Sequence, residues 1–401
     1  MNHLARVIEI QNLTEAEREL LKVGVYPDSL PIMAPKGVHR AIKLKDIPTV
    51  AANIIKQEML SKGGEAALSS GAVDLSKPKT DVLIFGTAQE IKEALEKFKL
   101  QPFGLKEIAS EIETILKNYQ ENPPPIKAGY LTLDFGQWTY MMGVLNVTPD
   151  SFSDGGKFIK VEDAVAHAKK MIEEGADIID IGGESTRPGA QVISIEEELS
   201  RVIPVIKKLS AETKACLSID TRKAPVAKEA LEAGVHLVND ISGLHYDREM
   251  GKIIKKFAVP VIIMHIQGDP QTMQVSPHYE DLIPEIMAYL KEGIEIAESA
   301  GVLREKIIID PGIGFGKTLE HNFEILRRLR EFRALGRPIS IGTSRKSMIG
   351  KVLDLPVEER LEGTAATVAL AIANGADIIR VHDVREMGRV AKMTDAIVRK
   401  W

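Results

Sequence analysis

The chain has 401 residues, which is long for a single core and favours two domains. It is 44% hydrophobic and 27% charged with a net charge of −5, so its composition is that of a globular protein and does not favour nucleic acid or an anionic membrane as a partner. Its one cysteine, Cys216, excludes an intrachain disulfide and fits a reducing compartment. The first residues carry acids and no long apolar run, so we expect no signal peptide and a cytoplasmic protein.

Residues 1–118 alternate strand-like and helix-like segments and predict a small α/β or α+β domain, whose role the sequence does not indicate. Within it, the segment 63–78 is rich in glycine, serine and alanine and predicts a loop. Residues 119–129, YQENPPPIKAG, contain three consecutive prolines, which end a helix and favour an extended backbone. We therefore predict a linker there, followed by a second domain at 130–401.

The second domain opens at residues 130–141 with two short extended segments around a glycine, which predict a β-hairpin. Eight β-branched apolar runs then alternate with helical periodicity, and each run stops at a polar or charged residue. Such runs are typical of parallel strands buried on both faces. The runs are 140–147, 177–183, 215–221, 236–242, 260–266, 306–312, 338–344 and 377–383. Eight βα units predict a (β/α)8 TIM barrel, with an open doubly wound sheet as the alternative.

The carboxyl ends of the strands carry the active site in a TIM barrel, so the ends of the eight runs are candidate site residues. Asp220, Asn239 and Asp310 end the third, fourth and sixth runs. Two carboxylates and an amide around one pocket suit a heterocycle with a guanidine-like edge, because each carboxylate can accept two parallel N–H bonds. The alternative role is capping of the following helices. It can explain one such acid, but it explains less well why three polar residues stand at equivalent strand ends.

Basic and hydroxyl side chains end other runs and predict an anion site. Thr186 and Arg187, in the segment GGESTRPGA, can bind an anion through a hydroxyl and a guanidinium. The segment GTSRKS places Lys346 at a helix N-terminus, where free N–H groups attract anions. Arg380 and His382 alternate in the eighth run and therefore point to the same side. With Arg187 they can hold a group the size of pyrophosphate.

Two loops complete the predicted rim. The loop NVTPDSFSDGG starts at Asn146 and carries oxygens that can coordinate a cation, with a polar surface turn as the alternative. In the loop DPGIGFGK we interpret the glycines as room for a ligand and Phe315 as an apolar wall, since the spacing of a P-loop is absent. His265 and Cys216 are interpreted as structural residues.

These motifs resemble, in this order, those of the dihydropteroate synthase family: LNVTPDSFSDGG, DIGGESTRPGA, SIDT, VNDISG, IMH, DPGIGFGK, GTSRKSMIG and RVHDV. The resemblance covers residues 130–401. It implies a transferase of folate biosynthesis, which joins 6-hydroxymethyl-7,8-dihydropterin pyrophosphate to p-aminobenzoate with Mg²⁺ and releases pyrophosphate. It also implies that pyrophosphate leaves first and that the arylamine then captures a stabilised pterin cation. Residues 1–118 are additional to the resemblance.

The resemblance further implies roles for individual residues. Asn146 would bind the metal or the pyrophosphate. The anion subsite would comprise Thr186, Arg187, Arg380 and His382. The pterin subsite would comprise Asp220, Asn239, Met264, Asp310 and Lys346, with Arg380 against the ring. The amine subsite would comprise Phe152, Pro188, Phe315 and Ser347. The catalytic groups would be Lys346, Arg380, His382 and Arg187.

Three other functions fit parts of the pattern. A pterin-binding methyltransferase would share the barrel and the pterin pocket, but it needs no pyrophosphate site, so Arg187, Arg380 and His382 argue against it. A non-catalytic pterin-binding protein would be expected to lack some rim residues, and none is missing. A synthase with a different arylamine acceptor stays open. We also expect a homodimer.

Overall fold

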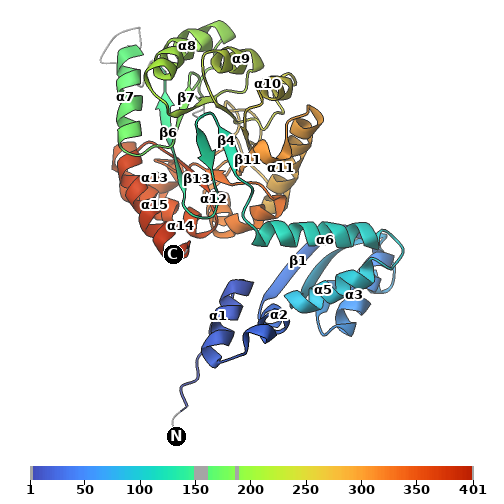
Figure 1. Cartoon of the computed structure of the whole chain (residues 1–401). Helices are drawn as coiled ribbons and strands as arrows, with labels where there is room; N and C mark the ends of the chain where they lie inside the picture. The colour runs from blue at the N-terminus through green and yellow to red at the C-terminus, as the bar shows by residue number, and fades with distance from the viewer. Residues whose placement is uncertain (1–2, 149–160, 186–188, 400–401) are drawn as a thin grey trace. The chain divides into compact units, whose positions relative to one another are not determined.

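The computed structural model describes residues 3–148, 161–185 and 189–399. The chain divides into two compact units, residues 1–120 and 121–401, each with a hydrophobic core of its own (Figure 1). The strands of the first unit are antiparallel, whereas the large sheet of the second unit is parallel. Among the described residues, no helix is long and apolar enough to cross a membrane.

The first unit is a three-stranded sheet in the order β1-β3-β2 with helices on one face. Its elements are α1 (Leu13–Val23), α2 (Leu30–Met33), β1 (His39–Pro48), α3 (Thr49–Ser61), β2 (Glu65–Leu68), α4 (Ser70–Val73), β3 (Lys79–Thr87), α5 (Ala88–Phe98) and α6 (Leu105–Gln120). Ile42 and Leu44 alternate with exposed residues along β1, so they reach the core from one face. The prediction of a loop at 63–78 is wrong, because pairing with β3 holds the alanine-rich β2 as a strand.

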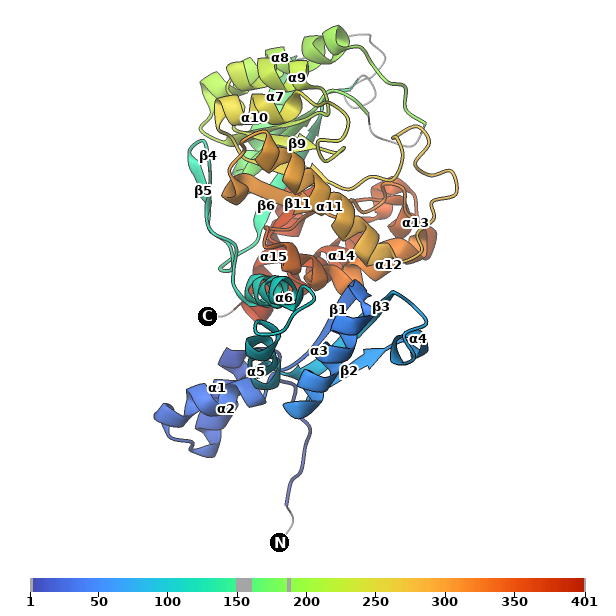
Figure 2. The ribbon, with the colours of Figure 1, turned by 90° about the vertical axis from the view of Figure 1, so that its right-hand side faces the viewer.

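The second unit is a closed (β/α)8 barrel, which confirms the prediction of a TIM barrel and excludes the open sheet (Figures 1 and 2). The parallel strands follow the order β11-β10-β9-β8-β7-β6-β13-β12. The ring closes where Ile339 pairs with Ile309, whose amide donates to the carbonyl of Pro338 at 2.9 Å. Each strand lies within a predicted run: β6 (Tyr140–Asn146), β7 (Ile178–Gly182), β8 (Cys216–Asp220), β9 (Leu237–Asp240), β10 (Val261–Met264), β11 (Ile307–Asp310), β12 (Ser340–Ile341) and β13 (Ile378–Val381).

Helices surround the strands of this barrel (Figure 1). They are α7 (Val161–Glu173), α8 (Ile195–Glu212), α9 (Ala224–Glu232), α10 (Met250–Phe257), α11 (Leu282–Ser299), α12 (Leu319–Arg328), α13 (Ser347–Leu353), α14 (Leu361–Ala373) and α15 (Val384–Val398). Three of the turns from a helix into a strand use a glycine with positive φ, namely Gly175 (103°), Gly234 (111°) and Gly375 (99°). A left-handed residue after a helix ends it and redirects the chain, which is how these short connections return to the barrel.

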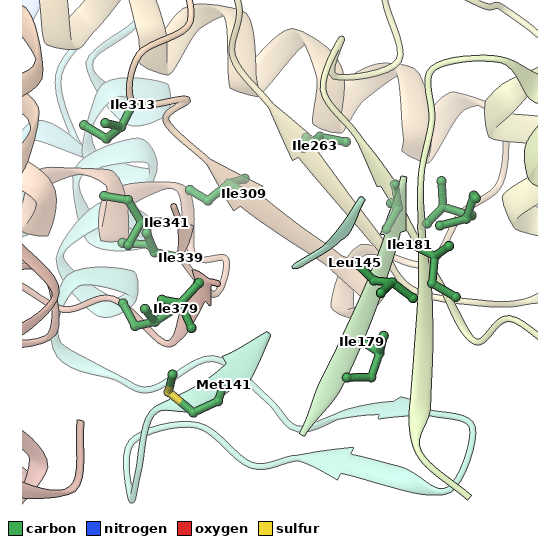
Figure 3. Close-up of a cluster of buried hydrophobic side chains, with 14 of the residues drawn as sticks. Met141, Leu145, Ile179, Ile181, Ile263, Ile309, Ile313, Ile339, Ile341 and Ile379 are labelled. Atoms are coloured by element: carbon green, nitrogen blue, oxygen red, sulfur yellow. The ribbon is translucent and has the colours of Figure 1, made fainter. Parts of the chain in front are cut away.

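The alternation of side chains along each strand gives the barrel two separate cores. Outward side chains such as Leu145, Ile179, Ile181 and Ile263 pack in the layer between strands and helices (Figure 3). Inward side chains near the amino ends of the strands form a second apolar cluster inside the barrel: Tyr140, Met142, Ile178, Cys216, Leu237, Ile262, Ile308 and Ile378. The outer core anchors the helices, and the inner core fills one end of the barrel.

An antiparallel hairpin packs against this inner core. It consists of β4 (Ile126–Ala128) and β5 (Leu131–Leu133), at the left edge of the barrel in Figure 2. The hairpin predicted at 130–141 is therefore displaced, because its turn lies at Gly129, whereas Tyr140 already belongs to the barrel. Gly129 has a φ of 60°, and a Cβ there would lie 2.2 Å from the ring of His236. Only glycine fits this turn without a shift of the histidine.

Candidate active site

At the carboxyl ends of the strands, the inward face of the barrel changes from apolar to polar. The inward polar residues are Asp180 of β7, Asp220 of β8, Asn239 of β9, Asp310 of β11 and Arg380 of β13. Strand register sets Asp220 beside Asn239, and Met264 beside Asp310. We call these five polar residues the polar layer. It forms because parallel strands end at the same edge of the barrel, so residues up to 200 positions apart meet there.

Arg380 joins the acids of the polar layer. Its Nε donates to Asp180 Oδ2 at 2.7 Å, and its Nη2 donates to Asp220 Oδ2 at 2.7 Å. Burial lowers the pKa of the Arg380 guanidinium. The nearby carboxylates of Asp180 and Asp220 have a larger effect together, so the pKa is raised overall. Arg380 is thus held at the centre of the layer, where its planar fork also gives two acids a fixed orientation.

Asp180 is a site residue that the sequence reasoning missed. It is fully buried, and its Oδ2 accepts a second bond from Asn239 Nδ2 at 3.0 Å. The signal was present in the segment IIDIGG, where a single acid interrupts an apolar strand. Because Asp180 lies two residues before Gly182, it faces the same side as the end of the strand, and a buried acid there requires partners.

Burial shifts the ionisation of three groups around the pocket toward neutrality. It raises the pKa of Asp220 to about 7; Arg380 opposes this rise and the nearby Asp180 adds to it. It also raises the pKa of Asp310, although the amide of Gly312, which donates to the carboxylate at 2.7 Å, works against it. Burial lowers the pKa of Lys346 to about 8, and Asp310 partly offsets this. Such groups can exchange protons with a substrate near neutral pH.

Lys346 and Phe315 contact each other. The ammonium of Lys346 donates to the carbonyl of Ile313 and lies 4.5 Å from the centre of the Phe315 ring. A cation over an aromatic face is held by the ring's quadrupole. This contact ties the segment after β12 to the loop after β11.

Two glycines of the loop DPGIGFGK, Gly312 and Gly316, pack against backbone and do not leave room for a ligand, contrary to the interpretation from the sequence. Gly312 and Gly316 have φ values of 70° and 64°, and both approach the segment after β10 closely. A Cβ on Gly312 would lie 1.9 Å from the carbonyl oxygen of His265, and one on Gly316 would lie 2.7 Å from Gln267. The glycines therefore serve backbone packing between neighbouring loops.

A second lysine, Lys317, is buried beside His265. Its Nζ lies 2.8 Å from His265 Nδ1 and donates to the carbonyl of Phe315 at 3.0 Å. Burial lowers the pKa of both groups well below their usual values, so a neutral pair fits this position. These contacts agree with the interpretation of His265 as a structural residue.

The remaining predicted residues surround the polar layer or are outside the described chain. A Cβ on Gly182 would lie 3.9 Å from Asn146 Oδ1 and 3.7 Å from Asp220 Oδ2, so both oxygens lie next to Gly182. His382 is exposed and its Nδ1 lies 3.0 Å from Ser344 Oγ, and Ser347 is an exposed first residue of α13. Four predicted residues lie outside the described residues, namely Phe152, Thr186, Arg187 and Pro188.

Comparisons with known proteins agree with the motifs in this barrel. Residues 142–382 match the pterin binding enzyme family. A dihydropteroate synthase of Synechocystis sp. is 51% identical over 278 residues, which is 69% of this chain and 96% of that protein. A crystal structure of dihydropteroate synthase from Clostridium difficile in the presence of pteroic acid is 55% identical with a TM-score of 0.63, and the match covers 67% of this chain and 99% of that one.

A third relative also matches the N-terminal unit. It is a probable bifunctional folylpolyglutamate synthase/dihydropteroate synthase of Halobacterium salinarum, 43% identical over 388 residues. The match covers 97% of this chain and 46% of that protein, so the extension ahead of the barrel is shared with at least this relative. By the family match and by the identity over nearly the full length of single-domain relatives, the chain belongs to the dihydropteroate synthase family of pterin-binding enzymes.

Proposed function

We propose that the protein is a dihydropteroate synthase, a transferase that joins 6-hydroxymethyl-7,8-dihydropterin pyrophosphate to p-aminobenzoate and releases pyrophosphate. The observation that carries this proposal is the polar layer, in which three acids, an amide and an arginine meet inside the carboxyl end of one barrel, with Lys346 nearby. The relative solved with pteroic acid supports it, because pteroic acid joins a pterin to p-aminobenzoate.

The pterin subsite follows from the hydrogen-bonding groups of the layer. The aminopyrimidine edge of a pterin offers neighbouring N–H donors and a carbonyl acceptor. Asp220 and Asp310 supply carboxylate acceptors, Asn239 supplies both kinds of group, and Lys346 supplies a donor. Met264, beside Asp310, supplies an apolar contact for the ring, and the guanidinium of Arg380 supplies a planar one.

The reaction requires stabilisation of a leaving anion more than it requires a nucleophile from the protein. The C–O bond to pyrophosphate breaks, and its electron pair leaves with the pyrophosphate. The resulting carbon cation, delocalised into the dihydropterin, takes the nitrogen lone pair of p-aminobenzoate, whose amine then loses a proton. Thr186, Arg187 and His382 would bind the leaving group. Cys216 lies in the apolar cluster at the amino ends of the strands, and burial raises the pKa of its thiol to about 12, so we assign it no role in the reaction.

We propose that Asn146 would hold Mg²⁺ at this site. The amide oxygen of Asn146 and a carboxylate oxygen of Asp220 both lie next to Gly182, and Mg²⁺ is commonly held by one or two protein oxygens together with phosphate oxygens. Among the described residues there is no group of three or more acids, histidines or cysteines that would hold a metal without the substrate. When bound, the ion would neutralise charge on the pyrophosphate.

We also propose which residues form the amine subsite, how the chain assembles and where it is located. Phe315 and Ser347, with Phe152 and Pro188, would line the p-aminobenzoate site. The position of Phe315 beside Lys346 supports an aromatic wall next to the pterin. We further propose a homodimer in the cytoplasm.

The test is a reaction of the purified chain with Mg²⁺, dihydropterin pyrophosphate and p-aminobenzoate, in which pyrophosphate and dihydropteroate are both quantified. Equal amounts of the two products are expected, and omission of the amine removes the dihydropteroate. A folded protein that binds pterin but forms neither product contradicts the proposal. Replacement of p-aminobenzoate by other arylamines tests the alternative acceptor, and methyltetrahydrofolate with a corrinoid protein tests the methyltransferase.

A further inference from the structure

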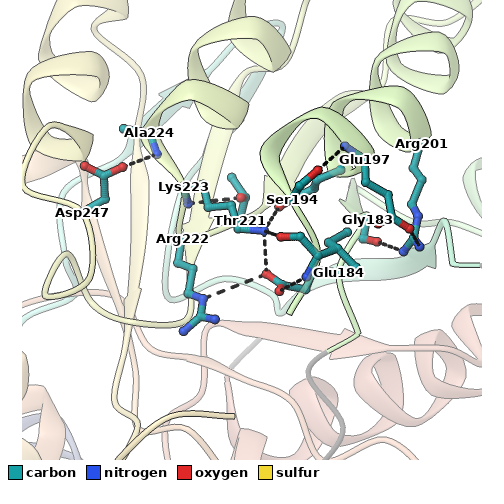
Figure 4. Close-up of polar contacts among 12 residues, drawn as sticks. Gly183, Glu184, Ser194, Glu197, Arg201, Thr221, Arg222, Lys223, Ala224 and Asp247 are labelled. Atoms are coloured by element: carbon teal, nitrogen blue, oxygen red, sulfur yellow. Dashed lines mark hydrogen bonds and ion pairs between the residues drawn. The ribbon is translucent and has the colours of Figure 1, made fainter. Parts of the chain in front are cut away.

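Side chains hold the loops at the carboxyl rim of the barrel in place. After β8, the ammonium of Lys223 donates to Glu198 Oε2 at 2.7 Å and lies 3.2 Å from Glu184 Oε2 (Figure 4). These ion pairs join the loop after β8 to the loop after β7 and to α8. The loop after β11, residues 311–318, is held differently, because side chains bind its backbone groups one by one, and one of its peptides reaches Lys346.

Two carbonyls of the loop 311–318 accept hydrogen bonds from the segment between β10 and α11. The carbonyl of Gly314 accepts from Gln274 Nε2 at 2.6 Å, and that of Gly316 accepts from Tyr279 Oη at 2.8 Å. A different path of the loop would break these bonds and leave their backbone groups without partners. The loop is therefore fixed by its neighbours.

One peptide of this loop connects Asn322 of α12 to Lys346. Its carbonyl, that of Ile313, accepts from Lys346 Nζ, and its N–H, that of Gly314, donates to Asn322 Oδ1 at 2.7 Å. Because a peptide group is planar and trans, the direction of its N–H fixes the direction of its carbonyl. Hydrogen bonds on both sides of one peptide also strengthen each other. Asn322 therefore determines where the acceptor of Lys346 lies.

Asn322 is itself held on both sides of its amide. It is 4% exposed, and its Nδ2 donates to the carbonyl of Thr318 at 2.6 Å. Thr318 is the N-cap of α12, where its side chain accepts from the amide of His321 at 3.2 Å. Since the side-chain amide is planar, the bond to Thr318 orients Oδ1 toward Gly314. Asn322 thus connects the capped start of α12 to the loop.

The loop also contacts the aliphatic part of Lys346. A Cβ on Gly314 would lie 3.2 Å from Lys346 Cδ, so a side chain there would press on the lysine. Among the described residues, Lys346 forms no ion pair with an acid, although the charges of Asp310 and Asp220 raise its pKa. The carbonyl of Ile313 thus keeps the ammonium close to these acids and not bound to them. Without that carbonyl, attraction would draw the ammonium onto a carboxylate.

We propose that Asn322 is a positioning residue for Lys346. Through the peptide between Ile313 and Gly314, it holds the ammonium beside the polar layer, where the ammonium donates to the pterin. The inference rests on the proposed function, which assigns Lys346 to the pterin subsite. Both sides of the Asn322 amide bind backbone groups, so Asn322 acts through Lys346 and not on the substrate.

A double-mutant cycle in the full-length chain tests this. Asn322→Leu removes the acceptor for the Gly314 amide and keeps the size of the side chain, and Lys346→Met removes the ammonium. Calorimetry measures the affinity of the parent, the two single variants and the double variant for 6-hydroxymethylpterin. Asn322→Leu should weaken binding about tenfold in the parent, because a displaced binding group loses its geometry. In the Lys346→Met background it should weaken binding by less than about twofold, because the group that it displaces is already absent.

Thr318→Ala is the matched control, because it weakens the start of the same helix and leaves the bond between Asn322 and Gly314 in place. It should leave the affinity unchanged. Asn322→Asp keeps an acceptor oxygen for Gly314 and should retain most of the affinity that Asn322→Leu loses. If Asn322→Leu does not fold, Asn322→Ser takes its place in the cycle, because its hydroxyl stops one bond short of the Gly314 amide.

Equal weakening with and without the Lys346 ammonium would show that Asn322 only stabilises the fold, and it would overturn the inference. Parental affinity in folded Asn322→Leu or Asn322→Ser would overturn it as well. The proposed function is judged apart from this, by the synthase activity of the unmodified chain.

Discussion

The two ends of the barrel interior are built from the same strands and have opposite chemistry. Toward the amino ends, Ile178, Leu237, Ile308 and Ile378 form an apolar cluster closed by the β4–β5 hairpin. Two residues further along the same strands, on the same face, stand Asp180, Asn239, Asp310 and Arg380. A step of two residues along a strand, about 7 Å, therefore separates the residues that hold the barrel together from those that we propose bind the substrate.

This division explains how a barrel can carry buried charges. The apolar end supplies stability through burial, and the polar end costs stability unless each charge is paired. Arg380 meets that cost by joining Asp180 and Asp220. Substitutions at the apolar end should therefore lower stability, whereas substitutions at the polar end should also lower activity, even where the two residues are neighbours on one strand.

The largest effect is expected for Arg380→Met. It leaves Asp180 and Asp220 buried beside each other without a cation, which should cost about 3–5 kcal/mol of unfolding free energy and at least about 100-fold in kcat/KM. Denaturant unfolding and steady-state kinetics measure the two losses. Adding Asp180→Asn and Asp220→Asn should recover much of the stability and none of the activity. Recovery of activity in this triple variant would show that the polar layer is only structural.

Ile308→Ala tests the other end, two residues before Asp310. The cavity that it leaves should lower the unfolding free energy by about 2–5 kcal/mol. At temperatures where the variant stays folded, kcat/KM should stay within about twofold of the parent value, as for independent sites. A large loss of kcat/KM in a folded variant would break the separation between the two ends.

The pH dependence of kcat/KM should report the polar end. With the pKa of Asp220 raised to about 7, the carboxylate that we propose as the acceptor for the pterin N–H groups forms as the pH rises through that value. With the pKa of Lys346 lowered to about 8, the protonated donor is lost as the pH rises further. We expect kcat/KM to have a narrow maximum between these two pH values. Because the groups are coupled, the apparent pKa of each limb describes the coupled set and not one residue. Lys346→Arg should flatten the alkaline limb, because arginine does not titrate there. A profile without an alkaline limb in the parent enzyme would remove Lys346 from this role.

The smallest effect is expected on removal of residues 1–120. All described residues of the polar layer belong to the second unit, so kcat/KM should stay within about twofold. A matched measurement of mass in solution tells whether the first unit contributes to assembly. A large drop in kcat/KM with an intact barrel would show that the first unit takes part in the reaction.

The sequence was sufficient for the barrel because each strand leaves a local mark. The β-branched runs ending at Asp220, Asn239 and Asp310 could be recognised singly, and their number implies closure. The sequence was insufficient where the role of a residue depends on a partner that is distant in the chain. The segment IIDIGG marks Asp180 as a buried acid, but its partners Arg380 and Asn239 are known only from the structure. Likewise, Lys223 looks like an ordinary residue after a strand until Glu184 and Glu198 are seen beside it. The packing of Gly312 and Gly316 could not be predicted for the same reason, since the residues that they approach are distant in sequence.

The most direct test of the account is a calorimetric titration of 6-hydroxymethylpterin into the parent protein, Asp220→Ala and Ile308→Ala. We predict one site in the parent, the same affinity in folded Ile308→Ala, and affinity reduced at least about tenfold in Asp220→Ala, because charged hydrogen bonds are worth about 1.5–3 kcal/mol each. Parental affinity in Asp220→Ala would contradict the claim that the polar end of the barrel is the pterin site.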